Sequence, residues 1–216
     1  MAIEVQKVVK SFGTTTVLHG IDLAIRDREF VTIVGKSGSG KTTLLYIMST
    51  LDEATSGSVA IDGINPADLD VEGLHLFRNK NIGYVFQFHY LLPELTVLEN
   101  VLLPARKDKS QEKKKTYALE LLETFGIADK AARFPSQISG GEQQRVAIAR
   151  ALVMKPKYVF ADEPTGNLDT ANGKIVMDLL KKVNREMGTT LVIVTHDPDY
   201  AALATRKIVV VDGRLS

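Results

Sequence analysis

The sequence contains no cysteine and no tryptophan, and it has almost no net charge. Without cysteine, a disulfide framework, a thiolate metal site and a cysteine nucleophile are all excluded. Aromatic residues make up only 6% of the 216 positions. Lys and Arg (27) nearly balance Asp and Glu (26), which leaves a formal net charge of +1. This balance does not favour nucleic acid as a partner, and we expect none.

Long uninterrupted apolar runs are also absent. No stretch reaches the roughly 18 apolar residues that a membrane-spanning helix requires. Met1–Val5 lacks the positively charged start and apolar continuation of a signal segment. We therefore expect a soluble cytoplasmic chain that reaches a membrane only through a partner. Its 44% hydrophobic and 25% charged residues are ordinary for one globular domain, with or without a sub-lobe.

Short apolar segments and helical patterns alternate towards both ends of the chain. The β-branched and aliphatic segments predict strands at 17–25, 30–34, 58–61, 81–86, 158–161, 190–194 and 207–211. Helical spacing of apolar residues predicts helices at 41–51, 113–125, 141–154 and 170–187. A further helix is expected to open at the capping pattern of Thr96 and Glu99. Alternation of this kind predicts an α/β fold with a mainly parallel sheet.

Between residues 88 and 156 the pattern becomes helical. We therefore predict one domain (1–216) in which residues 1–87 and 157–216 form a catalytic core, and residues 88–156 form an inserted helical lobe. The charge run Lys107–Lys115 lies in this lobe. A solvated helix face is the plainer interpretation of the run and a lipid-headgroup contact is the alternative, and we assign it no function.

The segment Gly35–Thr42 (GKSGSGKT) fits the pattern G-x-x-x-x-G-K-[ST], directly after an apolar strand and before a helix. Glycines let successive N–H groups converge on an anion, and the helix N-terminus adds its positive dipole end. Lys41 would contact the β- and γ-phosphates, and the Thr42 hydroxyl would bind magnesium. A glycine-rich turn without a ligand is the alternative. The motif predicts a nucleotide site but does not say which enzyme contains it.

Two adjacent acidic residues end the strand expected at 158–161. Asp162, at the carboxyl end of the strand, can meet a magnesium ion beside Thr42. Glu163 would point elsewhere and could take a proton from an attacking water. The alternative is a pair of acids in a surface turn before Pro164. Because nucleotide binding alone does not need the second acid, the pair favours a hydrolase.

A second glycine-rich segment, Ser139-Gly140-Gly141-Glu142, opens the helix expected at 141–154. Ser139 and Glu142 have the spacing of a capping box, so one interpretation is a well-capped helix and nothing more. Glycines and a serine hydroxyl at a helix N-terminus also form an anion-binding site. The chain would then hold two helix ends that bind phosphate.

Taken together, these segments resemble the nucleotide-binding subunit of an ABC transporter, and the resemblance covers essentially the whole chain. The matching segments follow the order of that family: Phe12 for the adenine-stacking aromatic, Gly35–Thr42 for Walker A, Gln87 for the Q-loop, Ser139–Glu142 for the signature, Tyr158–Glu163 for Walker B, Asn167–Asp169 for the D-loop and His196 for the switch histidine. Residues 87–100 and 166–169 further resemble the lipoprotein-release and macrolide-export group. Glu142, where many members carry glutamine, and Lys36, where proline is common, depart from the pattern.

The resemblance implies a P-loop NTPase core with an antiparallel β subdomain, and hydrolysis of ATP to ADP and phosphate with ATP and Mg²⁺ as cofactors. Glu163 would be the catalytic base, supported by His196 and Gln87. Thr42, Asp162 and Gln87 would hold the metal. Contacts to nucleotide would come from Phe12, Gly35, Ser37, Gly38, Ser39, Gly40, Lys41, Thr42, Thr43, Ser139, Gly140, Gly141 and Glu142.

Three of these residues have plainer interpretations when each is taken alone. His196, after the strand expected at 190–194, could be a hydrogen-bonded structural residue instead of a contact to the γ-phosphate. Gln87 could be a polar residue at the end of a strand. Phe12 could be an ordinary core residue.

The resemblance also implies partners. Ser139–Gly141 would complete the nucleotide site of a second copy of the chain, so that two chains enclose two ATP molecules head to tail. A separate integral membrane permease would hold the chain at the cytoplasmic face of the inner (plasma) membrane and would export or extract a lipoprotein, peptide or drug-like substrate. The alternatives are a soluble ABC-type ATPase of DNA repair or translation, which would carry a coiled-coil insertion or a second cassette, and a P-loop switch or kinase, which would lack Ser139–Glu142.

Overall fold

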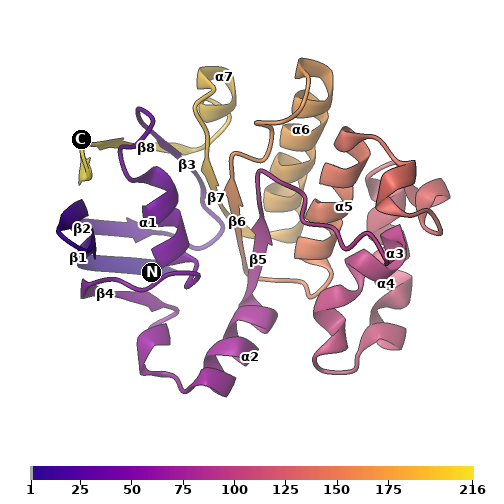
Figure 1. Cartoon of the computed structure of the whole chain (residues 1–216), viewed down its shortest axis with the longest axis horizontal. Coiled ribbons are helices and arrows are strands. Elements are labelled where there is room, and N and C mark those ends of the chain that lie inside the picture. Colours follow the sequence, from indigo (N-terminus) through magenta and orange to yellow (C-terminus); the bar gives the residue numbers. More distant parts are fainter. Residues whose placement is uncertain (1) are drawn as a thin grey trace.

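The strands of the computed structural model, which describes residues 2–216, form two sheets (Figure 1). The larger sheet has six strands in the order β5-β6-β7-β3-β8-β9. Its parallel strands are β5 (Ile82–Val85), β6 (Tyr158–Asp162), β7 (Thr190–Val194), β3 (Phe30–Val34) and β8 (Arg206–Val211), and β9 (Arg214–Leu215) pairs antiparallel with β8. Parallel strands end at the same edge of a sheet, so the loops after β3, β5, β6 and β7 meet there.

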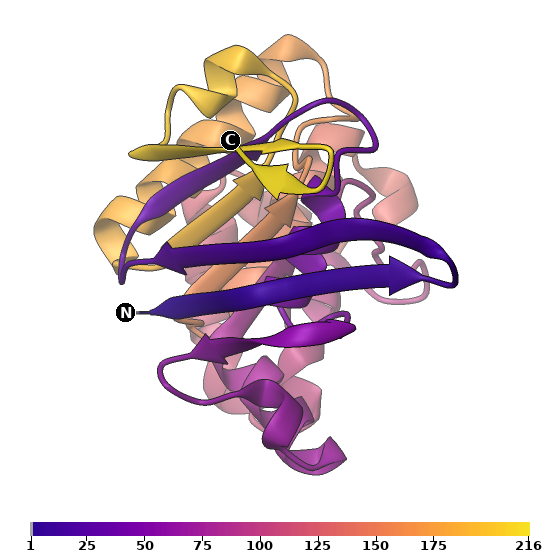
Figure 2. The same cartoon turned by 90° about the vertical axis from the view of Figure 1, so that its left-hand side faces the viewer.

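The smaller sheet is antiparallel, with strand order β2-β1-β4. It forms a separate layer that faces the viewer in Figure 2. It consists of β1 (Ile3–Phe12), β2 (Thr15–Ile25) and β4 (Ser56–Ile61). The pairing of β1 with β2 shifts register at three points along the strand, so its alternation of inward and outward residues is interrupted.

Helix α1 (Lys41–Met48) lies between the two sheets, and α5 (Gly140–Leu152) and α6 (Thr170–Met187) cover the opposite face of the larger sheet (Figure 1). Because side chains alternate along a strand, the buried strands supply two different cores. Tyr158 and Phe160 of β6 pack with α1 and the antiparallel sheet. Val159 and Ala161 pack with the helices on the other face.

The remaining helices are α2 (Val71–Asn81), α3 (Val97–Val101), α4 (Gln111–Thr124) and α7 (Pro198–Ala201). Short 3-10 turns connect them at Pro66–Asp68, Leu103–Arg106, Ala128–Lys130 and Pro135–Gln137. Helices α3, α4 and α5 fall within the stretch predicted as the helical lobe, and they share one hydrophobic core with the parallel sheet. The proposed division of the chain at 88 and 156 stays a prediction. Within residues 2–216, no helix is both long enough and apolar enough to cross a membrane.

The expected elements are present with their type unchanged. The bounds of β3, α6 and β7 are those predicted, and the ends of the others differ by a few residues. The antiparallel subdomain is also confirmed. Four elements were not expected from the sequence: β1, α2, α7 and β9. Asn81, the expected start of a strand, is instead the last residue of α2, and β5 begins one residue later.

Candidate functional site: a phosphate cradle at the sheet edge

The loop between β3 and α1 has the backbone conformation that the glycine-lysine motif predicts. Gly35 and Gly40 have φ angles of 155° and 100°. The left-handed φ at Gly40 favours glycine, and a Cβ at Gly35 would lie 2.1 Å from the Val210 carbonyl oxygen, so backbone packing requires glycine there. The Lys41 Nζ folds back and donates to the Lys36 carbonyl at 2.9 Å. This hydrogen bond connects the first residue of α1 to the loop that precedes it.

The Thr42 hydroxyl donates to the Asp162 Oδ1 at 3.1 Å, which joins the start of α1 to the end of β6. Asp162 is only 9% exposed. Burial raises the pKa of its carboxyl, while hydrogen bonds from the Thr42 and Tyr46 hydroxyls act in the opposite direction. The sequence predicted the convergence of Thr42 and Asp162, and the structure places the two side chains in contact.

Glu163 and His196 form a second contact beside the first. The Glu163 Oε2 lies 2.9 Å from the His196 Nδ1. Glu163 follows β6, His196 follows β7, and the Glu163 N–H donates to the Val194 carbonyl at 3.0 Å. Glu163 has a φ of 43°, a left-handed conformation that residues with a Cβ rarely adopt. The two neighbouring acids thus have different partners, as Asp162 contacts Thr42 and Glu163 contacts His196.

Gln87 follows β5 and lies against the loop that comes after the two acids. Its carbonyl accepts a hydrogen bond from the Asn167 Nδ2 at 3.1 Å. A Cβ at Gly166 would lie 2.9 Å from the Gln87 Nε2, so the side chain packs on that glycine. Gln87 therefore reaches the same sheet edge as the acids, and its contact with metal or water stays a prediction.

Ser139 and Glu142 form the capping box that their spacing predicts. The Glu142 Oε2 accepts from the Ser139 N–H at 2.7 Å, and the Ser139 Oγ accepts from the Glu142 N–H at 3.3 Å. Hydrogen bonding to Ser139 lowers the pKa of Glu142, so its carboxylate remains ionised. This departure from the family pattern therefore has a structural role at the start of α5.

The signature segment does not lie against the chain's own cradle. Ser139 and Gly140 are exposed. Gly141 packs on the start of α6, where a Cβ would lie 2.3 Å from the Asn172 Oδ1. Among the described residues, the hydrogen bonds of Ser139 and Glu142 stay within the start of α5, and none joins this segment to residues 35–42. The structure therefore separates the two predicted phosphate-binding helix ends.

Phe12 is the last residue of β1, and its side chain is 54% exposed. The Lys10 Nζ lies 4.8 Å from the centre of its ring. The interpretation as an ordinary core residue is therefore wrong. An exposed ring leaves room for a stacked base, and the contact with adenine stays a prediction.

The residues of the cradle fit a magnesium-bound triphosphate. Lys41 is 7% exposed and uses one donor on the Lys36 carbonyl, which leaves two for phosphate oxygens. The buried Ser39 Oγ has no hydrogen-bond partner within residues 2–216. Ser37 and Gly38 are exposed, and Thr43 is half-buried. Mg²⁺ takes one or two carboxylates together with phosphate oxygens, which matches Thr42 beside Asp162. Residues 2–216 contain no cluster of three or more His, Cys, Asp or Glu for a metal held by protein alone.

Tyr46 is a residue of this site that the sequence interpretation missed. It lies one turn after Thr42 on α1, close enough to Asp162 for each group to influence the pKa of the other. Burial and the nearby Asp162 raise the pKa of its hydroxyl. The spacing of four positions from Thr42 is the signal that could have found it, because it places both side chains on one face of the helix.

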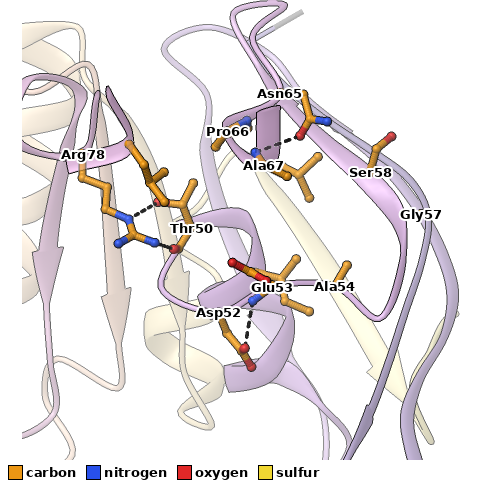
Figure 3. Close-up of a pocket in the computed structure, with 13 residues that line it drawn as sticks. Thr50, Asp52, Glu53, Ala54, Gly57, Ser58, Asn65, Pro66, Ala67 and Arg78 are labelled. Carbon is orange, nitrogen blue, oxygen red and sulfur yellow. Dashed lines mark hydrogen bonds between the residues drawn. The ribbon is translucent and has the colours of Figure 1, made fainter. Parts of the chain in front are cut away.

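A separate pocket lies near the other end of α1 (Figure 3). It has a volume of about 140 Å³ and is lined by the end of α1, by β4 and by α2. Arg78 of α2 points to Thr50, donating from Nε to its hydroxyl at 2.9 Å and from Nη2 to its carbonyl (Figure 3). None of the predicted site residues lines this pocket, so it is not part of the cradle.

Comparison with known proteins identifies the family of the chain. The ABC transporter family model matches residues 18–166. The lipoprotein-releasing system ATP-binding protein LolD of Leptospira interrogans is 52% identical over 99% of this chain and 90% of its own length. The protein of the same name from Aquifex aeolicus is 49% identical over 98% of this chain and 93% of its own length.

Solved structures agree with the fold. The dimeric bacterial ABC transporter cassette MJ0796 is 43% identical, with a TM-score of 0.89 and coverage of 99% of this chain and 96% of its own. A post-hydrolysis dimer of that cassette, bound to ADP and phosphate, has a TM-score of 0.87 at 41% identity, with the same coverage. The chain therefore belongs to the ABC transporter family. Within that family it is an ATP-binding subunit, the component that hydrolyses ATP.

Proposed function

We propose that this chain powers a lipoprotein-releasing transporter, as a pair of copies bound to an integral membrane permease at the cytoplasmic face of the inner membrane. One observation carries the proposal. The phosphate cradle, the Asp162–Thr42 contact and the Glu163–His196 contact meet at one edge of the parallel sheet. The assignment of lipoprotein as the transported substrate is supported by the names of relatives that are about half identical to this chain.

The chemistry follows from the positions of the side chains. Phosphoryl transfer asks little covalent chemistry of the protein, so catalysis consists of positioning and charge neutralisation. Lys41 and the loop N–H groups hold the β- and γ-phosphates. Glu163 accepts a proton from water as the water oxygen bonds to the γ-phosphorus and the bond to the β–γ bridging oxygen breaks. His196, at 2.9 Å, keeps the Glu163 carboxylate oriented and lies near the transferred group.

Thr42, Asp162 and Gln87 would hold Mg²⁺, which supplies charge neutralisation for the phosphates when it is bound. The adenine would stack on Phe12. The hydrogen bond between Thr42 and Asp162 preorders two of these groups before nucleotide arrives. Ser37, Gly38, Ser39, Gly40 and Thr43 supply the remaining contacts of the cradle.

The separation of the signature segment from the cradle supports the pair of copies. Within residues 2–216, the helix start at Ser139, Gly140 and Gly141 makes no hydrogen bond to the chain's own P-loop, and Gly141 packs on α6. These residues would contact nucleotide held by a second chain, with Glu142 fixing the helix start. The MJ0796 cassette is dimeric in both solved states. A Glu163→Gln protein with Mg-ATP should form dimers in analytical ultracentrifugation. A protein that stays monomeric at high concentration would contradict this part of the proposal.

The membrane partner is tested by affinity capture. Tagged chain, expressed in its own host, should co-purify from detergent-solubilised membranes with an integral membrane protein in a constant ratio. Released lipoprotein should then depend on ATP in vesicles that contain the complex. A chain recovered only from the soluble fraction, with full ATPase activity, would favour a soluble ABC-type ATPase instead.

A further inference from the structure

A side chain of helix α5 hydrogen-bonds to the backbone next to two predicted catalytic residues, Gln87 and Glu163. Gln144, one turn after the signature segment, is fully buried. Its Nε2 donates to the Pro164 carbonyl at 2.7 Å and to the Phe86 carbonyl at 3.3 Å. Phe86 immediately precedes Gln87, and Pro164 immediately follows Glu163. One amide of α5 therefore joins the loops after β5 and β6.

Arg150 makes a second connection near the other end of the same helix. Its Nη1 donates to the Tyr90 carbonyl at 2.7 Å, and its Nη2 donates to the His89 carbonyl at 2.6 Å. The Asn167 Nδ2 donates to the Gln87 carbonyl between these contacts. Side chains therefore hold four of the five backbone carbonyls in residues 86–90.

The contact made by Arg150 is specific to its chemistry. The planar guanidinium has donors at a fixed separation, so one side chain reaches two consecutive carbonyls with charge-assisted hydrogen bonds. Tyr90 has a φ of 44°, a conformation that needs support from its surroundings. Lysine could keep the charge and one bond, but it could not present the same fork.

We propose that Arg150 is a positioning residue that fixes the signature helix relative to the segment after Gln87. Ser139 lies at the start of α5 and Arg150 lies near its end. Because the helix is rigid, hydrogen bonds that restrain Arg150 also restrain the position of Ser139. The consequence for catalysis rests on the proposed sandwich of two copies, in which Ser139 contacts nucleotide held by the other chain. The link itself exists within one chain and can be measured without a dimer.

The first measurement uses the isolated chain. Because the sequence has no cysteine, Ser136→Cys and Lys207→Cys give two clean positions for spin labels, one before α5 and one on β8. Both side chains are exposed. With Arg150 present we expect a narrow distance distribution by pulsed electron resonance. Arg150→Ala should broaden it about twofold, and Arg150→Lys should give an intermediate width. An unchanged width in Arg150→Ala would overturn the proposal.

The second measurement uses the Glu163→Gln background with Mg-ATP. Arg150→Ala should raise the protein concentration for half-maximal dimerisation about tenfold, as expected for the loss of charge-assisted hydrogen bonds. The affinity of a fluorescent ATP analogue, measured on dilute monomer, should stay within about twofold because Arg150 does not touch the cradle. Arg185→Ala, on the exposed end of α6, is the matched control.

The outcomes separate the two proposals. If the parent Glu163→Gln protein does not dimerise but the label distances broaden, the sandwich is wrong and the link stands. If Arg150→Ala dimerises as the parent does, the link has no role in assembly and the proposal fails. Should Arg150→Ala not fold, Arg150→Gln, which is shorter but keeps a polar side chain without the charged fork, replaces it in both measurements with the same expected direction.

Discussion

Glu163 and His196 show how the fold positions a pair of residues at the end of two neighbouring strands. The left-handed backbone of Glu163 is unfavourable for a residue with a Cβ, and the hydrogen bond from its N–H to the Val194 carbonyl helps to hold it. This conformation follows directly after Asp162, whose side chain contacts Thr42. The strained backbone at Glu163 therefore occurs where two adjacent acids have different partners, Thr42 for Asp162 and His196 for Glu163.

The Glu163 carboxylate is predicted to be the group on which turnover depends most. Glu163→Gln should lower kcat for ATP hydrolysis by at least about 100-fold, the scale of general base catalysis, and leave the affinity for ATP nearly unchanged. His196→Ala should also lower kcat. Since the two side chains act as a unit, the double variant should lose little more than Glu163→Gln alone. Phosphate release checks this. Multiplicative losses in the double variant would show that the contact at 2.9 Å has no catalytic role.

The residues that the sequence predicted well are those whose chemistry is carried by a local pattern. Lys41, Thr42 and the two acids sit in motifs of adjacent positions, so their roles could be proposed without coordinates. Tyr46 belongs to no such motif. The spacing of four positions places it on the face of α1 that carries Thr42, but its proximity to Asp162 depends on how α1 packs against β6. The pairing of Glu163 with His196 likewise depends on β6 and β7 being neighbours.

At the scale of single elements, the start of α5 has both structural and predicted functional roles. The Glu142 carboxylate bonds to the Ser139 N–H at 2.7 Å. Glu142→Ala should lower the free energy of unfolding by about 0.3–1.5 kcal/mol at pH 7. Glu142→Gln should lose less, because its amide oxygen can still accept the hydrogen bond.

The charge-dependent part of this effect has a defined pH dependence. The folded-state pKa of Glu142 is lowered from 4.5, so its stabilisation is complete above that value and is lost as the pH falls through the folded-state pKa. The stability difference between the native chain and Glu142→Gln should therefore shrink in acid below about pH 4.5. Urea unfolding at several pH values measures it. A difference that is constant between pH 7 and pH 3 would contradict the capping role of the charge.

Asn100 of α3 holds the loop that leads away from Gln87. It is fully buried, its Oδ1 accepts from the Leu92 N–H at 2.8 Å, and its Nδ2 donates to the carbonyls of Leu92, Leu95 and Thr96. Asn100→Ala leaves the buried loop's Leu92 N–H and Leu95 carbonyl without their side-chain partner, while the Leu92 and Thr96 carbonyls keep backbone hydrogen bonds. We therefore expect a loss of about 1–3 kcal/mol of unfolding free energy. Asn79→Ala, on the half-buried face of α2, is the control. Equal stability of the two variants in urea would refute this role.

The elements that were missed have physical reasons in their sequences. β1 shifts register three times against β2, which breaks the alternation that identifies a strand. α2 contains Gly73 and has no fully buried residue, so it offers no apolar stripe. α7 and β9 are too short to show a period. In contrast, α6 has a continuous apolar face that ends at Gly188 with a φ of 65°, and its bounds were predicted correctly.

At the scale of the whole molecule, function follows from the order of strands in one sheet. The strands that precede Lys41, Gln87, Glu163 and His196 are β3, β5, β6 and β7, which form a continuous part of the parallel sheet. Motif spacing along the chain cannot show which strands are neighbours. The structure supplies that arrangement. The signature segment lies apart from this edge, which is why a second copy is proposed to complete the site.

Isothermal titration calorimetry of Mg-ATP into the Glu163→Gln chain tests the central claim most directly, because this background limits turnover. One nucleotide should bind per chain. Lys41→Ala in the same background should weaken binding at least about tenfold by removing a buried cation from the phosphates, and removal of Mg²⁺ should also weaken it. Absence of binding by the Glu163→Gln chain, or equal binding by Lys41→Ala, would contradict the assignment of residues 35–42 and Asp162 to a single magnesium-bound triphosphate.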